Sequence, residues 1–184
     1  MLHIFKVVNF KKILILALIF LLPFGASSGK SAENNEIDRT QRVYFSPNGH
    51  VRSRIIEEVN RSKYSIDIAV FNFTSTGIRS ALRKAFKRGV RIRVVADKRE
   101  SEDFHSAIGS LIRDGIAVKL IQGKGRNGLM HHKFAVFDHE ILLTGSYNWT
   151  ETAERYSYEN ALFLRDKTLI NDYQKEFDLL WGKA

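Results

Sequence analysis

Residues 130–150 hold a histidine and a lysine whose spacing suits phosphate chemistry. The segment MHHKFAVFDHEILLTGSYNWT contains His131 and Lys133, separated by one residue, and continues through an apolar stretch to Asp138. Alternate side chains of a strand point to the same face, so His131 and Lys133 are expected to share one face and His132 the other. An imidazole is a nucleophile when neutral and an acid when protonated, and a neighbouring ammonium binds anions. The pair therefore predicts chemistry on a phosphate group.

The spacing of these residues resembles the HKD motif of the phospholipase D superfamily. The residues that carry this resemblance are His131, Lys133 and Asp138, followed by Gly145, Ser146 and Asn148 and then by Glu159 and Asn160. More narrowly, residues 42–182 are similar to the small bacterial nucleases of this superfamily that carry a single motif. No departure is found at the matched positions.

The resemblance implies a role for each matched residue. His131 is expected to attack phosphorus and form a phosphohistidine. Glu159 is expected to accept a hydrogen bond from the far ring nitrogen of His131 and so fix its tautomer. Lys133 and Asn148 are expected to hold the nonbridging oxygens, with Ser146 helping through its hydroxyl or its backbone amide.

Asp138 is the last residue of the matched motif, and a structural role is favoured for it over a catalytic one. A strand rises about 3.3 Å per residue, which carries Asp138 beyond hydrogen-bond reach of His131. No metal or other cofactor is expected, because the lysines and asparagines already offset the phosphate charge. A zinc site built from His131, His132 and His139 is disfavoured, since adjacent histidines in a strand diverge and the chain has no cysteine.

One histidine cannot stand on both sides of a phosphorus atom. In-line displacement needs an attacking group and, opposite it, a proton donor for the leaving oxygen. The chain holds a single copy of the motif, because no matching lysine follows His3, His50, His105 or His139. The resemblance therefore implies a homodimer in which two copies of His131 face a two-fold axis and share one active site.

The chain is basic, which favours a polyanionic partner. Its formal charge is +9, from 29 Lys and Arg against 20 Asp and Glu. Without residues 1–28, which hold three lysines and no acid, 26 − 20 leaves +6. DNA is the expected partner, with RNA as an open alternative. Lys124 and Arg126, in the loop before the motif, are candidate contacts to the nucleic-acid backbone or simply solvated, and the basic run from Arg79 to Arg93 is a candidate extension of that track.

The amino-terminal residues have the pattern of an export signal. Residues 1–28 combine three lysines, an apolar run from Ile13 to Phe24 and small residues that suit a cleavage site after Ser28. The competing interpretation is an uncleaved membrane anchor. Either one predicts an exported protein, periplasmic or secreted, with membrane attachment only if the segment is retained.

Alternating strand and helix patterns predict an α/β fold. Residues 29–41 are polar and aperiodic and are expected to be a linker, and residues 42–184 are expected to form one domain. The expected architecture is a mixed, mostly parallel sheet flanked by helices on both faces. Strands are predicted at 43–45, 65–73, 90–96, 116–121, 131–137, 141–144 and 161–165, and helices at 51–60, 76–88, 102–114 and 167–181.

Three functions fit these residues. The first is a metal-independent exported endonuclease that cleaves DNA with little sequence specificity. The second is a phospholipase D-type enzyme that hydrolyses phospholipids, which is less favoured because no apolar lipid-docking segment is visible beyond residues 1–28. The third is a non-catalytic basic nucleic-acid-binding domain, which the intact motif disfavours.

Overall fold

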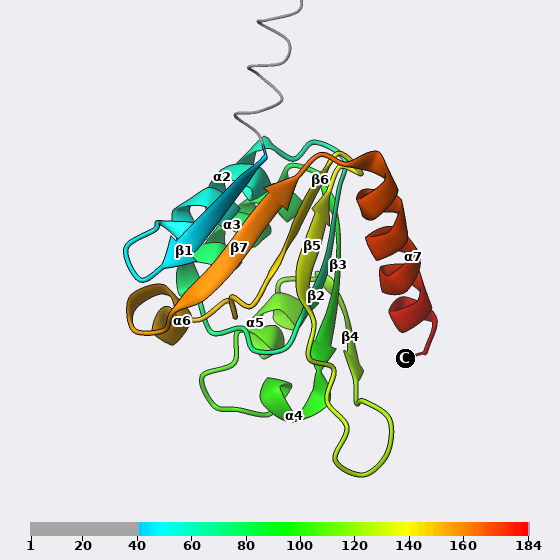
Figure 1. The fold of residues 1–184 in the computed structure, drawn as a ribbon. Helices are drawn as coiled ribbons and strands as arrows, with labels where there is room; N and C mark the ends of the chain where they lie inside the picture. The colour runs from blue at the N-terminus through cyan, green and yellow to red at the C-terminus, as the bar shows by residue number, and fades with distance from the viewer. Residues whose placement is uncertain (1–40, 184) are drawn as a thin grey trace, which may run out of the picture. The chain divides into compact units, whose positions relative to one another are not determined.

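The motif strand is the middle strand of the sheet. Lys133–Phe137 form β5, with three strands on either side in the order β1-β7-β6-β5-β2-β3-β4 (Figure 1). The computed structural model describes residues 41–183. The remaining elements are β1 (Arg42–Ser46), α2 (Val51–Arg61), β2 (Ser65–Val70), α3 (Thr76–Lys87), β3 (Arg91–Asp97), α4 (Lys98–Ser101), α5 (Ile108–Arg113), β4 (Ala117–Ile121), β6 (Ile141–Gly145), α6 (Glu151–Arg155), β7 (Glu159–Leu164) and α7 (Lys167–Lys183).

The sheet is mixed, as predicted, but it is not mostly parallel, because four of its six strand pairs are antiparallel. β3 pairs in parallel with β2 and with β4. The pairs β2–β5, β5–β6, β6–β7 and β1–β7 are antiparallel. The reason lies in the connections: helical crossovers join β2 to β3 and β3 to β4, whereas β5 turns directly into β6 at residues 138–140.

The two faces of the sheet bury different side chains. Ala135 and Phe137 of β5 pack into the larger core, which α2, α3 and α5 cover. Phe134 and Val136 point to the opposite face, where α7 covers a smaller core (Figure 1). The predicted alternation along β5 and the predicted helices on both faces are therefore confirmed.

The helix predicted at 102–114 is wrong in its first half. Asp97 ends β3 and caps a short helix, α4, by accepting bonds from the backbone amides of Arg99 and Glu100. Residues 102–107 then form a loop, in which the Asp103 carboxylate accepts the backbone amide of His105. Such side-chain bonds to the backbone compete with helix formation.

The final helix is confirmed, and it was expected to bury a stripe formed by Leu169, Tyr173, Phe177 and Leu180. Ile170, Phe177 and Leu180 are buried, and Tyr173 packs against them, whereas Leu169 is exposed rather than buried. The short helix α6 was not predicted. The expected signal segment 1–28 lies outside the described residues, as does the linker 29–41 except for its last residue. No helix within residues 41–183 is long and apolar enough to cross a membrane.

Candidate active site

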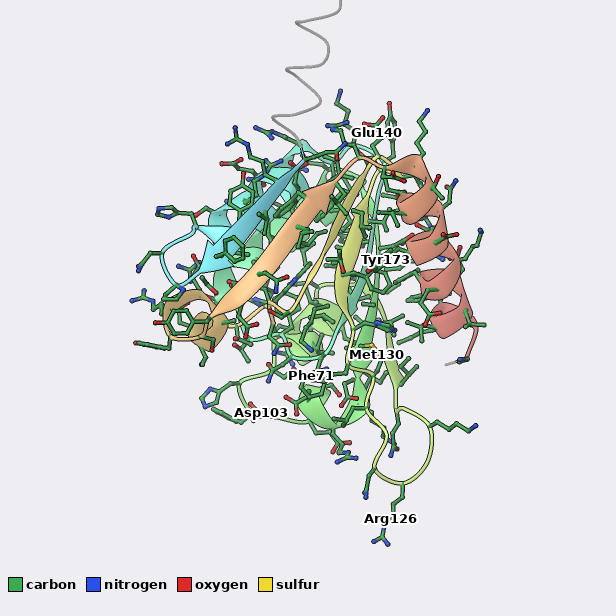
Figure 2. All side chains as sticks on the ribbon, in the orientation of Figure 1. Phe71, Asp103, Arg126, Met130, Glu140 and Tyr173 are labelled. Atoms are coloured by element: carbon green, nitrogen blue, oxygen red, sulfur yellow. The ribbon has the colours of Figure 1, made fainter. Side chains whose placement is uncertain are left out.

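The candidate catalytic residues meet at one end of the sheet. β2, β3 and β6 end there, while β5 and β7 begin there, so that Lys133 pairs with Val70 and Gly145 pairs with Ala161. Phe71 and Met130 mark this end in Figure 2, and Glu140 marks the opposite end. The strand directions thus bring together residues that are far apart in the sequence.

His131 and Lys133 are in direct contact. The Lys133 Nζ lies 3.1 Å from His131 Nδ1 and 3.3 Å from Nε2, and it donates to the His131 carbonyl oxygen at 2.9 Å. The Phe71 ring supports both groups, with its centroid 4.4 Å from the His131 ring centroid and 4.9 Å from Lys133 Nζ. An anion that draws the ammonium toward itself would release the imidazole for reaction.

The surroundings favour the neutral form of His131. Partial burial lowers its pKa, and the positive charge of Lys133 acts in the same direction, whereas Asp97 and Glu100 oppose the shift. Burial also lowers the pKa of Lys133, and Glu159 and Glu100 oppose that shift. A neutral imidazole beside a cation is the state that a nucleophile needs when it approaches a phosphate.

Ser146 holds Glu159 at the site. Its hydroxyl donates to the Glu159 carboxylate and accepts from the Asn160 backbone amide at 3.1 Å. Gly145 permits this turn, because a Cβ there would lie 2.3 Å from the Asn160 carbonyl oxygen. Among the described residues the Glu159 carboxylate bonds to Ser146 and not to His131, which differs from the expected tautomer-fixing bond within one chain.

Asn148 lies in a segment that is fixed from both sides. Trp149, which is buried, donates its backbone amide to the Asn72 carbonyl oxygen, and the Tyr147 hydroxyl donates to Glu154 at 2.8 Å. The Asn148 Oδ1 is buried and has no hydrogen-bond partner among the described residues. This oxygen is an acceptor, so the donor that the same side chain offers to a phosphate is its Nδ2.

Asp138 lies at the end of β5 that is opposite to the candidate site. Its carboxylate accepts three backbone amides, from Lys63, Tyr64 and Ser65, each at 2.8 Å. The seven steps along the chain from His131 to Asp138 span about 23 Å at the rise of a strand. Asp138 therefore joins the start of β2 to the end of β5, and the structure does not bring it to the candidate site.

The basic residues outside the motif divide into two groups. Lys124 lies beside His131 in the loop between β4 and β5, whereas Arg126 stands at the tip of that loop, pointing outward (Figure 2). Much of the basic run from Arg79 to Arg93 has structural partners. Arg93 bonds to buried Asp67 at 2.7 Å, and Arg88 caps the end of α2 through three carbonyl oxygens. Several members of the run are nevertheless exposed, so a track along it stays a prediction; these are Arg83, Lys84, Lys87, Arg88 and Arg91.

Sequence reasoning missed the residues that position the motif from β2 and β3. Phe71 donates its backbone amide to the His132 carbonyl oxygen at 2.9 Å. Asn72 donates its side-chain amide to Glu100 at 2.6 Å. Asp97, which is 1% exposed, accepts the backbone amide of Met130. A polar residue directly after a β-rich run was the available clue, because such residues lie at the end of the sheet where sites form.

Within residues 41–183, no group of three or more His, Asp or Glu is arranged to hold a metal ion.

Comparison with known proteins supports the same family. A family model described as "Cardiolipin synthase, PLD-like domain" matches residues 55–181. The chain belongs to the phospholipase D-like family. The predicted resemblance to this superfamily is thereby confirmed, and the motif residues described above lie within the matched range.

Relatives of this phospholipase D-like chain include enzymes and bacterial proteins. Mitochondrial cardiolipin hydrolases from Xenopus tropicalis and Xenopus laevis are 39% and 40% identical to it over 129 residues, covering 70% of this chain and 60% of theirs. The chain thus spans well under two thirds of the length of these relatives. Among solved structures, Nuc from Salmonella typhimurium, a phospholipase D family member, has a TM-score of 0.69 at 27% identity and covers 77% of this chain and 93% of its own. NucT from Helicobacter pylori has a TM-score of 0.73 at 24% identity, with 77% and 95% covered, which shows a shared fold.

Proposed function

We propose that this chain is an exported phosphodiesterase that hydrolyses DNA, and RNA as a further substrate, with little sequence specificity and without a metal. The observation that carries the proposal is the contact between His131 and Lys133 at the end of the sheet, where the pKa of His131 is lowered. The net charge of +9 supports a polyanionic substrate. Export rests on the pattern of residues 1–28 alone.

The proposed reaction has two steps. In the first, a ring nitrogen of His131 attacks phosphorus, the bond to the leaving oxygen breaks, and a second histidine gives that oxygen a proton. In the second, that histidine takes a proton from water, the water oxygen attacks phosphorus, and the phosphorus–nitrogen bond breaks. Each bond formed is matched by one broken, and His131 returns to its neutral form.

The second histidine comes from a second copy of the chain in this proposal. His132 directly precedes β5 and is turned toward α7, where its Nε2 lies 3.4 Å from a Glu176 carboxylate oxygen. His139 follows Asp138 at the opposite end of β5. A two-fold axis beside His131 would place two imidazoles and two Lys133 ammonium groups around one phosphate. Glu159, which makes no bond to His131 in its own chain, would then be available to orient the imidazole of the other copy.

The phosphate would be held by groups that already converge on the site. Lys133 leaves the imidazole to contact a nonbridging oxygen, where negative charge grows in the transition state. The Asn148 side-chain amide supplies a neutral donor, while the Ser146 hydroxyl is committed to Glu159 and Asn160. Ser146 therefore helps the reaction by positioning Glu159 through its hydroxyl.

Phospholipid hydrolysis is the second candidate function. The observation that favours it is the similarity to proteins named mitochondrial cardiolipin hydrolase, at 39% and 40% identity over 129 residues. Cardiolipin, like DNA, carries phosphodiester groups that the same imidazole and ammonium pair could attack. The two candidates therefore share one chemistry and differ in the substrate that reaches the site.

One experiment separates the candidates. The purified protein is incubated in excess EDTA with plasmid DNA, with single-stranded oligonucleotides and with cardiolipin vesicles, and products are measured for each. The proposal predicts nucleic-acid cleavage that His131→Ala lowers by at least about a thousandfold and that His139→Ala, a control at the opposite end of β5, leaves unchanged. Turnover of vesicles alone would establish the second candidate, and binding of DNA without turnover would overturn both.

A further inference from the structure

A pocket of about 490 Å³ lies directly beside His131 on the α7 side of the sheet. Its walls come from the end of β4, the loop between β4 and β5, and the end of α7. The residues that line it are Leu120, Ile121, Gln122, Gly123, Lys124, Leu129, Met130, His131, His132, Leu180 and Lys183. Met130, one of the residues that line it, is labelled in Figure 2. Its volume falls in the range of sites for small molecules.

The pocket combines aliphatic walls with a cationic rim. Leu120 and Leu129 are 39% and 40% exposed, so its apolar surface is open to solvent. Lys124 reaches it from the loop, and Lys183 reaches it from the end of α7. None of the residues that line it is acidic. The charge and the walls together suit a ligand with an apolar face and anionic groups at its edges.

The pocket is formed before any ligand arrives. Asp97 anchors Met130 at 2.8 Å, and the Gln122 side-chain amide closes the loop by donating to the Arg126 carbonyl oxygen at 3.0 Å. The neck of the loop is tight, because a Cβ on Gly123 would lie 2.3 Å from the Leu129 backbone nitrogen. Rigid walls reduce the entropy that a ligand must lose on binding.

We propose that this pocket binds the nucleoside adjacent to the phosphate that His131 attacks and Lys133 binds. The proposal rests on the nuclease function proposed above and adds a subsite to it. His131 borders both the pocket and the reacting phosphate, so the neighbouring nucleoside of a bound strand lies at the pocket entrance. Lys124 and Lys183 then contact the phosphates that flank it.

The walls favour a base over an acyl chain. Half-exposed leucines would leave much of an acyl chain in water, whereas a base needs to bury only a face and keeps its polar edges solvated. The aliphatic side chains can pack against any base, because they form no hydrogen bonds with its polar groups. The Gln122 side-chain amide already donates to the Arg126 carbonyl oxygen. The subsite therefore strengthens binding without selecting a sequence.

The test uses oligonucleotides that each carry one abasic residue, scanned along the strand. Removing the base next to a phosphate should lower kcat/KM for cleavage at that phosphate by about tenfold, because the base no longer buries its face against the aliphatic walls. An abasic residue four or more positions away should have no effect. Equal cleavage of all these strands would overturn the subsite and leave the proposed function standing.

A pair of variants assigns the effect to the pocket. Leu129→Asp places a carboxylate in the pocket and should raise KM about tenfold with little change in kcat, and it should remove the difference between intact and abasic strands. Leu179→Asp is the matched control, because Leu179 is 53% exposed on α7 and does not line the pocket. Its KM, its kcat and its difference between intact and abasic strands should equal those of the unaltered protein.

Two further results would overturn the subsite. If Leu129→Asp abolishes binding to cardiolipin vesicles while oligonucleotide cleavage is unchanged, the pocket holds an acyl chain instead. If the unaltered protein cleaves no nucleic acid, the proposed function fails and the subsite fails with it. Circular dichroism of both variants checks that they fold.

Discussion

The buried carboxylate of Asp97 accepts the backbone amide of Met130 at 2.8 Å, directly before His131 in the chain. Its other oxygen accepts the amides of Arg99 and Glu100 and so caps α4. One side chain thereby ties the end of β3 to the segment that carries the nucleophile. The same negative charge raises the pKa of His131, against the lowering by burial and by Lys133.

Replacing Asp97 should misplace His131 and lower its pKa. Asp97→Asn removes the negative charge that favours the imidazolium and should lower kcat by about tenfold to a hundredfold. Asp97→Ala leaves three amides without an acceptor and should lower the free energy of unfolding by about 2–4 kcal/mol. Urea unfolding and steady-state kinetics measure the two effects. Asp172→Asn, on the exposed side of α7, is the control, and equal behaviour of Asp97→Asn and this control would contradict the positioning role.

His131 should titrate below an ordinary histidine, whose pKa is about 6.5. Burial and Lys133 both favour its neutral form, so the acid limb of the pH profile of kcat/KM should lie below that value. Lys133→Gln removes the neighbouring positive charge, and the pKa of His131 should then rise. Imidazole proton resonances followed by NMR report this directly even where activity is lost. A fall in the pKa on Lys133→Gln would contradict the electrostatic account.

Asp138 should matter for stability and not for chemistry. Asp138→Ala leaves the amides of Lys63, Tyr64 and Ser65 without their acceptor and should lower the free energy of unfolding by about 2–4 kcal/mol. Asp138→Asn keeps an acceptor and tolerates the left-handed backbone at φ 52°, so its effect should be smaller. Activity per folded molecule should be unchanged at a temperature where both variants are folded. A loss of kcat above a hundredfold with normal thermal unfolding would make Asp138 catalytic.

Mixed dimers test whether two copies share one active site. When the unaltered protein is unfolded and refolded with increasing amounts of His131→Ala, activity should follow the square of the unaltered fraction, because only dimers with two histidines react. Independent monomers would give a linear dependence. Lys63→Ala, an exposed substitution far from the site, serves as the mixing control and should leave activity proportional to total protein.

The Ser146 hydroxyl should act through Glu159. Ser146→Ala removes the bonds to the Glu159 carboxylate and the Asn160 amide, so the carboxylate should lose its fixed orientation. We expect kcat to fall by about tenfold to a hundredfold with KM nearly unchanged, since substrate binding by Lys133 and Asn148 remains. Ser146→Thr retains the hydroxyl and should recover part of the activity. A rise in KM at constant kcat would instead make Ser146 a phosphate ligand.

Local patterns determined much of the fold. The alternation of side chains from His131 to Phe137 placed Ala135 and Phe137 in one core and Phe134 in the other, because a strand offers only two faces. The helix predicted at 76–88 forms as α3, and Ser75 directly before it accepts the Ile78 backbone amide at 3.4 Å. These features depend on neighbours within a few residues, so the sequence alone is sufficient to predict them.

Local patterns did not predict the features that depend on contacts between residues far apart in the sequence. Apolar spacing continued the helix prediction across 102–107, where the Ala107 amide instead bonds to the Phe73 carbonyl oxygen. The basic run suggested a nucleic-acid track, but Arg93 is bonded to Asp67 in the adjacent strand. In both cases the hydrogen-bond partner lies more than twenty residues away in the sequence. That distant contact sets the local structure at Ala107 and the position of the Arg93 side chain.

The types of the reacting residues and the spacing of His131 and Lys133 were determined by the sequence, because one short segment carries both. The strand predicted at 131–137 begins only at Lys133, so His131 lies directly before it. Only the tertiary structure decided that Asp97 anchors Met130, that Ser146 holds Glu159, and that a pocket opens beside the site. Each of these arrangements joins strands that are separate in the chain. Their order in the sheet is set by the global balance of buried surface and backbone pairing, which no local pattern encodes.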